Sequence, residues 1–214
     1  MKRFFLLLFS FSCLGSFAQT KFGIVAGYQL SDIGSYDLIE TSSTGNFIIG
    51  VLTEHRFRRL PLYLSGQVVY APAGYSKSNI QAEDKSGNPL GDIDLHRIGY
   101  IKVPVYLLYG GRAGSVVLKG GLGSFIAFQT GDKLKIKGGD AFGNGTVLPS
   151  YMKKITPVLY GIHFQAGVEW SPVMISLHFS QSFNGLYLPV SAAAQKWKAT
   201  AYGITVGFFF IKRQ

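Results

Sequence analysis

The chain has 214 residues, which suits a single domain, and its formal net charge of +10 raises the question of nucleic-acid binding. No basic helix or nucleic-acid motif is present, however, so we do not expect a nucleic-acid partner. Only 15% of the residues are charged while 47% are hydrophobic, whereas soluble domains carry about 25% charged residues. No run of 18 or more apolar residues follows the N-terminal region, which excludes a membrane-spanning helix.

The first 18 residues form a predicted secretory signal peptide. Lys2 and Arg3 precede a short apolar segment, and Ser16-Phe17-Ala18 is a small-x-small cleavage site. We expect cleavage after Ala18, so that residues 19–214 form the exported domain. A second hypothesis attaches a lipid at Cys13, but the aliphatic residue usual three positions upstream of such a cysteine is missing.

Eight stretches alternate apolar and polar residues, which is the pattern of β-strands with one apolar face. In chain order they cover about 22–30, 46–56, 62–71, 100–109, 116–129, 158–170, 173–182 and 201–210. The opposite face holds mainly glycine, serine and isolated charges, which suits a narrow interior filled by side chains. A wet surface would instead be rich in lysine and glutamate.

The connections alternate between long and short. Residues 55–61, 110–114 and 171–172 form predicted tight turns, while 31–45, 72–99, 130–157 and 185–197 form longer polar loops. This alternation is typical of outer-membrane barrels, whose short turns face the periplasm. The sequence therefore predicts an all-β, eight-stranded, antiparallel, up-and-down transmembrane β-barrel in the bacterial outer membrane. The last strand must pair with the first, because an open edge in hydrocarbon leaves backbone groups unpaired.

Aromatic residues near the predicted strand ends suggest an interfacial girdle. The alternative is that they are ordinary strand aromatics. The residues are Tyr70, Tyr75, Tyr109, Tyr160, Trp170, Tyr187 and Trp197.

Three segments carry a resemblance to a known family. They are the Gly-x-x-x-Gly-Tyr strand from Gly23 to Tyr28, the Tyr-Ile-Lys-Val-Pro-Val-Tyr-Leu-Leu-Tyr segment from Tyr100 to Tyr109, and Lys119-Gly120-Gly121-Leu122-Gly123. Together they resemble the outer-membrane β-barrel domain family of Bacteroidetes, which includes a gingipain-secretion protein. The resemblance implies the fold and the location. Lys102 stands where that family often has a glutamate, so no role of a carboxylate is carried over to this position.

Polar residues of the inward-facing set form a candidate lumen network. Charges inside a narrow barrel are costly unless they are paired, so we expect Lys102 and Lys119 to form ion pairs with Glu54 or Glu169. The predicted role of this network is stabilisation. Its members are Glu54, Gln67, Lys102, Lys119, His163, Gln165, Glu169 and His178.

Two other kinds of chemistry compete for the lumen residues. A hydrolase would use His163 or His178 as the base beside Ser176 or Ser180, but no nucleophile-elbow motif accompanies them. Two histidines without a third ligand are weak evidence for a metal site. We therefore predict no catalytic residue, no metal site and no cofactor. His55 and His96 fall in a predicted turn and a predicted loop, where we expect solvated side chains.

Two basic clusters lie outside the lumen. Lys133, Lys135 and Lys137 alternate with apolar residues, which suggests either contact with lipopolysaccharide phosphates or a solvated extension of a strand. Arg56, Arg58 and Arg59 gather in the first predicted periplasmic turn, where lipid head groups or a periplasmic partner would meet them.

The predicted function is structural or interactive. An eight-stranded barrel is just wide enough for side chains to fill it. We therefore expect an envelope component that presents its loops outside the cell and has outer-membrane lipids and an envelope protein as partners. A small-solute porin is the alternative, and a lipid-modifying outer-membrane enzyme is the third hypothesis.

Overall fold

The computed structural model describes residues 19–34, 41–57, 59–76, 81–84, 89–136, 146–147, 155–187 and 197–210. The predicted signal peptide, residues 1–18, lies outside them, as do Arg58 and Lys137. Within these residues, no helix has the length and apolar character needed to cross a membrane.

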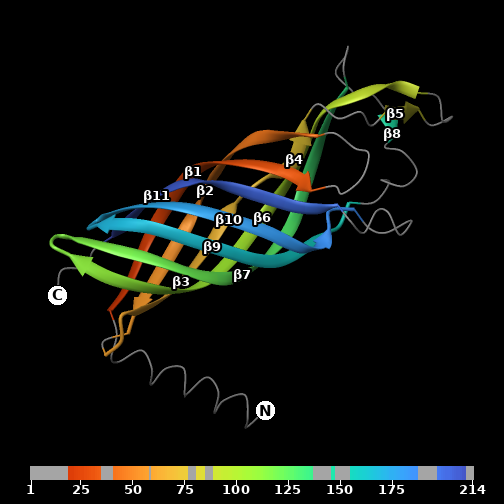
Figure 1. Ribbon diagram of the computed structural model, residues 1–214. Helices are drawn as coiled ribbons and strands as arrows, with labels where there is room; N and C mark the ends of the chain where they lie inside the picture. The colour runs from red at the N-terminus through yellow and green to blue at the C-terminus, as the bar shows by residue number, and fades with distance from the viewer. Residues whose placement is uncertain are drawn as a thin grey trace, which may run out of the picture.

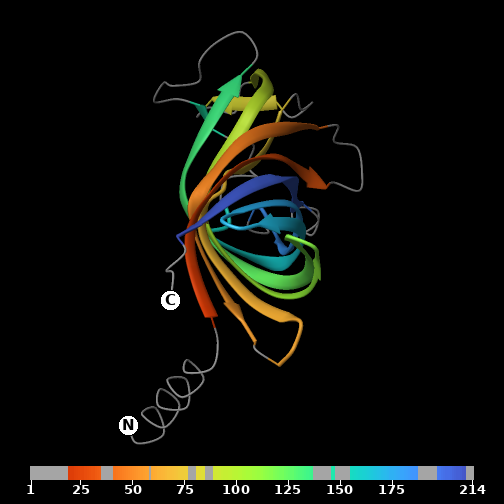
Figure 2. The same cartoon turned by 90° about the vertical axis from the view of Figure 1, so that its left-hand side faces the viewer.

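Eight long strands form a closed antiparallel ring in the described part of the chain (Figures 1 and 2). Each strand pairs with the next long strand along the chain, and the last pairs with the first, which confirms the predicted up-and-down barrel. In ring order the strands are β1 (Gln19–Gly34), β2 (Ser42–Arg56), β3 (Leu62–Tyr70), β6 (Pro89–Ala113), β7 (Val116–Ile136), β9 (Val158–Trp170), β10 (Val173–Gly185) and β11 (Lys198–Phe210).

Closure of the ring satisfies both edges of the sheet. β1 and β11 pair from Phe22↔Phe210 to Gly34↔Lys198, so the register continues along almost the whole of both strands. Because all backbone hydrogen bonds of a closed barrel lie between strands, no edge is left to the surroundings.

The barrel has two distinct ends. The turn end carries the short connections β2–β3, β6–β7 and β9–β10, and the first and last described residues, Gln19 and Phe210, also lie there. The loop end carries the longer connections. The predicted turn at 171–172 is confirmed. The turn predicted at 110–114 is misplaced, because β6 continues to Ala113 and the turn is formed by Gly114 and Ser115, with Gly114 at a φ of 62°.

Three short strands were not predicted. β4 (Ala73–Ser76) bridges β2 and β6 above the end of β3, while β5 (Gln81–Asp84) pairs with β6 and β8 (Thr146–Val147). β6 and β7 run well beyond their predicted limits and stay paired from Ile93↔Ile136 to Ala113↔Val116. The sheet therefore extends past the barrel at the loop end, as Figure 1 shows on the upper right.

Residues alternate between the two faces as the sequence predicts. In β9 the odd-numbered residues from Leu159 to Glu169 point inward, and most of them are buried, whereas Tyr160, Phe164 and Trp170 are exposed. The interior is filled by apolar clusters. Tyr63, Tyr106 and Leu108 form one near the turn end, and a larger one near the loop end includes Tyr75, Tyr187 and Trp197.

The predicted girdle is wrong for three of its seven residues. Tyr75, Tyr187 and Trp197 are at most 5% exposed and pack inside the loop end of the barrel. Their segments follow strand ends, so sequence position alone did not show which way the rings point. The other four, Tyr70, Tyr109, Tyr160 and Trp170, are exposed on the outer face.

Candidate functional site

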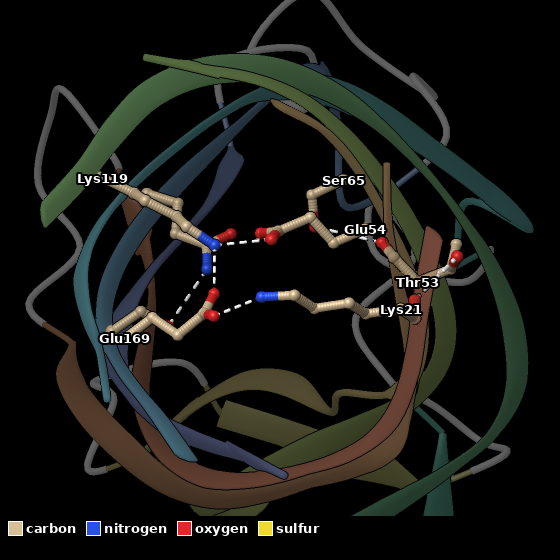
Figure 3. A network of polar contacts seen from close by, with 8 residues as sticks. Lys21, Thr53, Glu54, Ser65, Lys119 and Glu169 are labelled. Atoms are coloured by element: carbon tan, nitrogen blue, oxygen red, sulfur yellow. Dashed lines mark hydrogen bonds and ion pairs between the residues drawn. The ribbon is translucent and has the colours of Figure 1, made fainter. Parts of the chain in front are cut away.

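A cluster of four charged side chains crosses the lumen near the turn end (Figure 3). Lys119 on β7 donates to Oε1 of Glu54 on β2 at 2.5 Å, and it also pairs with Glu169 on β9. Lys21 on β1 pairs with the other oxygen of Glu169. Two lysines thus meet two carboxylates contributed by four different strands.

Three of the four side chains, Glu54, Lys119 and Glu169, are buried, and aromatic rings lie beside both lysines. Glu54 is 1% and Glu169 3% exposed, so neither carboxylate is solvated by bulk water. The ammonium of Lys119 lies 4.4 Å from the centre of the Tyr63 ring, and that of Lys21 lies 5.2 Å from the Phe209 ring. Since buried charges are costly unless paired, the equal numbers of positive and negative groups are what makes this arrangement tenable.

Lys102 does not join this cluster. Lys119 pairs across the sheet with Gly110 on β6. Gly110 lies eight residues from Lys102, which is about 26 Å along the strand. Lys102 instead donates to the hydroxyl of Ser180 at 2.7 Å, and its ammonium lies 4.3 Å from the Phe125 ring. The expectation that Lys102 forms an ion pair with Glu54 or Glu169 is therefore wrong, because Lys102 and Lys119 lie at different heights in the barrel.

The remaining predicted lumen residues gather near Lys102. The rings of His163 and His178 are 5.5 Å apart, and the hydroxyl of Tyr106 lies 3.4 Å from His163. Gln165 donates to Ser176 at 3.1 Å. Gln67, His163, Gln165 and His178 border a cavity of about 10 Å³ together with Lys102, which is room for roughly one water molecule. The eight predicted residues are thus divided between two separate sites.

The serines of the lumen bond to groups other than the histidines. Ser180 accepts from Lys102, while Ser176 bonds to Thr205 at 2.8 Å as well as to Gln165. The cavity that Ser180 borders measures about 30 Å³, which is much smaller than a lipid substrate. Among the described residues, no three His, Cys, Asp or Glu side chains come close enough together to hold a metal ion.

A second buried polar group lies at the loop end. Nδ1 of His96 lies 2.7 Å from the hydroxyl of Tyr187, which in turn donates to Tyr75 at 3.3 Å. Nε2 of His96 lies 3.8 Å from Asp132 at the surface. The imidazole beside it lowers the pKa of Asp132, which lies beyond the apolar part of the barrel wall.

Of the two histidines expected to be solvated, only His96 contradicts the expectation of exposure. His96 is 0% exposed and lies on β6, because the extended strand carries it into the aromatic cluster. His55 lies on β2, where its ring nitrogen is 2.9 Å from the Thr20 hydroxyl, and it is only partly exposed.

Sequence reasoning missed Lys21, Tyr63 and Phe209 as parts of the charge cluster. Parity indicates all three. Lys21 has the inward parity of Gly23 and Val25, Tyr63 that of Ser65 and Gln67, and Phe209 that of Thr205 and Gly207. Of the three lysines assigned to lipopolysaccharide contact, Lys133 and Lys135 are exposed on the extended part of β7, and Lys137 lies outside the described residues.

The fold and the lumen define a class of protein: a closed eight-stranded β-barrel with an apolar outer wall and a charged, side-chain-filled interior. No model of a known protein family matches the chain, and no curated protein matches it. The resemblance to the Bacteroidetes family therefore stays a prediction.

Solved structures similar to this chain include two bacterial proteins. One is Ail, the attachment invasion locus protein of Yersinia pestis, in complex with the heparin analogue sucrose octasulfate, with 13% identity and a TM-score of 0.45. The other is Neisserial surface protein A, with 12% identity and a TM-score of 0.45. Each match covers 90% of this chain and 99% of the other. At these identities and TM-scores, the likeness carries no information on activity or binding.

Proposed function

We propose that this protein is an integral outer-membrane barrel with a closed lumen, and that it acts as a structural or interaction component of the cell envelope. The observation that carries the proposal is the outer wall. Phe47 is 78% exposed, Trp170 69% and Leu122 64%, and large apolar side chains of this kind point outward from all eight strands. Soluble monomers rarely expose apolar patches beyond a few hundred Å². A wall of this kind is suited to acyl chains.

Exposed aromatic residues near both ends of the wall support the same placement. Tyr109 and Trp170 lie at the turn end, and Tyr70 and Tyr160 lie toward the loop end. Tyrosine and tryptophan favour the membrane–water interface, because their rings are apolar and their N–H or O–H groups reach water.

In this proposal the turn end faces the periplasm and the loop end faces outward. Short turns on the periplasmic side and longer external connections are the usual arrangement, and the predicted signal peptide would supply the export route. The extended parts of β6 and β7 would then stand above the membrane. There the exposed Lys133 and Lys135 would meet lipopolysaccharide phosphates, and the loops would meet an envelope partner.

The charged cluster fits a structural role in such a barrel. Lys21, Glu54, Lys119 and Glu169 tie four strands together near the turn end. Between this cluster and the loop end, the cavities that described residues line in the lumen measure only about 10 and 30 Å³, which supports a lumen closed to solutes. We therefore favour a plugged barrel over the porin alternative and over a lipid-modifying enzyme.

The decisive experiment places a charge on the outer wall and measures the change in the free energy of unfolding. Leu122→Arg places a charge on the wall near mid-height, and in a bilayer it should destabilise the refolded protein by about 2–4 kcal/mol in urea unfolding from vesicles. In a soluble barrel the same change would replace exposed apolar surface with charge and leave stability within about 0.5 kcal/mol. Ser115→Arg, in the exposed β6–β7 turn, is the matched control and should have no effect.

Two simpler measurements accompany that variant. The protein refolded in vesicles should show heat-modifiable gel mobility and should give no steady single-channel current in a planar bilayer. Free solubility of residues 19–214 without detergent would overturn membrane insertion. A steady current would overturn the plugged lumen alone.

A further inference from the structure

A groove of about 510 Å³ crosses the outer wall toward the turn end. Its volume lies within the range of about 300–1,000 Å³ that small-molecule sites occupy. No charged residue lines it, and its polar lining comes only from Thr53 and Gln67. The apolar residues that form its sides are Phe22, Ile24, Val51, Val68, Val103 and Phe210.

A glycine on the outer face creates the depression. The outward-facing residues of β3 include Leu64, Gly66 and Val68, so a side chain is missing in the middle of the row. A Cβ atom added at Gly66 would meet only Cγ2 of Thr53, at 3.6 Å, which is ordinary van der Waals contact. The space over Gly66 is therefore open, and a larger residue could fill it without moving the backbone.

The groove coincides with an interruption in the β-ladder. β3 and β6 pair from Leu62↔Tyr109 to Gly66↔Val105, and pairing resumes only at Val69↔Lys102. Pro104 lies in the unpaired stretch of β6, where its lack of an N–H removes a ladder donor. Gln67 borders both the groove and the lumen cavity, so the two spaces lie on either side of the same residue.

We propose that this groove holds one acyl chain of a phospholipid, an inference that rests on the proposed membrane placement. An apolar, slender ligand fits a groove with no charged lining that opens directly into the apolar wall. The turn end is the periplasmic side in that placement, and the periplasmic leaflet of the outer membrane is made of phospholipid.

A basic residue of the β2–β3 connection suits the phosphate of the same lipid. Arg56 does not take this role, because it has the inward parity of Glu54 and its guanidinium lies 5.8 Å from the centre of the buried Tyr63 ring. Arg59 is exposed in the turn that follows β2. An acyl chain in the groove would bring its phosphate toward the Arg59 side chain, and guanidinium groups bind phosphate well.

Photolabelling in vesicles tests the proposal. The refolded protein is mixed with phosphatidylglycerol that carries a diazirine on one acyl chain, and the adducts are mapped by peptide mass spectrometry. We expect several-fold more label on Val51, Val68 and Val103 than on wall residues distant from the groove, such as Leu122 and Ile175. A diacylglycerol with the same labelled chain should label the groove less, because it lacks the phosphate.

Filling the groove provides the matched pair of variants. Gly66→Phe should abolish the excess label. Gly120→Phe should leave it unchanged, because Gly120 also faces outward in open space but lies on β7, away from the groove. Val103→Phe is a second filling variant in case Gly66→Phe refolds poorly.

The outcomes separate this inference from the proposed function. Uniform labelling of the wall, or excess label that survives both filling variants, would overturn the groove while leaving membrane insertion intact. Equal labelling by diacylglycerol would contradict the role of Arg59. Absence of label on the whole wall, together with a protein that stays soluble, would overturn both proposals.

Discussion

Nζ of Lys119 lies 2.5 Å from Oε1 of Glu54, although the two residues are 65 positions apart and lie on strands that do not pair with each other. The contact crosses the lumen from β7 to β2, as Figure 3 shows. Through Glu169 it continues to Lys21 on β1. The cluster therefore links opposite walls of the ring, which the backbone ladder alone connects only around its circumference.

The first prediction concerns the centre of this cluster. Lys119→Met should destabilise the barrel by about 3–5 kcal/mol, because it leaves two buried carboxylates with only Lys21 to compensate them. The measurement is urea unfolding of the refolded protein in vesicles. Lys133→Met, at an exposed position on the same strand, is the control and should change stability by less than about 0.5 kcal/mol. A loss of the same size in both variants would show that the cluster has no special role.

The second prediction treats the other buried lysine, which should respond in the opposite way. Lys102 bonds to the hydroxyl of Ser180 and lies over the Phe125 ring, and none of the ion pairs among the described residues includes it. Lys102→Met removes the cost of burying a charge. It leaves only the Ser180 hydroxyl without its hydrogen-bond donor, so the free energy of unfolding should stay equal or rise. The same unfolding assay compares it with Lys119→Met. A loss above about 2 kcal/mol for Lys102→Met would mean that the lumen holds a counter-charge for it.

Much of the fold could be predicted from alternation. The period of two fixes which residues share a face, so the sequence alone predicts that Glu54, Lys119 and Glu169 point inward. Height in the barrel could not be predicted in the same way, because it depends on the register between strands. Register is why Lys119 meets Glu54 while Lys102, with the same inward parity, meets Ser180.

The loop end was less predictable than the wall. The segment around His96 contains glycine, aspartate and histidine, which favour a loop, but β6 continues through it because β4 and β7 supply pairing partners on both sides. Tertiary pairing thus overrides local composition there. The burial of Tyr75, Tyr187 and Trp197 follows from the same extension, since the added strands enclose an apolar core beyond the predicted barrel.

The third prediction concerns two adjacent glycines of β7 that face opposite sides of the wall. A Cβ atom at Gly121 would lie 2.1 Å from the backbone oxygen of Leu107, whereas one at Gly120 would have no neighbour closer than 4.0 Å. Gly121→Ala should therefore force β6 and β7 apart and cost about 1–3 kcal/mol, while Gly120→Ala should be tolerated. Urea unfolding of the two variants in vesicles measures the difference. Equal stability of both would contradict the close approach of the two strands.

The fourth prediction concerns pH at the loop end. The contact with His96 lowers the pKa of Asp132 below the value of about 3.9 expected in the unfolded chain. A lowered carboxyl pKa contributes stability that is fully present above the unfolded pKa and is lost as the pH falls through the folded pKa. Asp132→Asn should therefore cost less than about 1 kcal/mol at neutral pH, since the side chain is 45% exposed.

The measurement for Asp132 is hydrogen exchange of the backbone amides of β6 and β7 beyond the apolar wall, followed from neutral pH to below about pH 4. Protection in the wild type should fall in the acid range faster than in Asp132→Asn, because only the wild type has a carboxylate at position 132 to protonate. Asp92 and Asp94 on β6 titrate in both proteins and do not affect the comparison. Lys133→Gln, at the next residue of β7, should follow the wild type. Parallel curves for the wild type and Asp132→Asn would mean that the His96–Asp132 contact does not stabilise this end of the barrel.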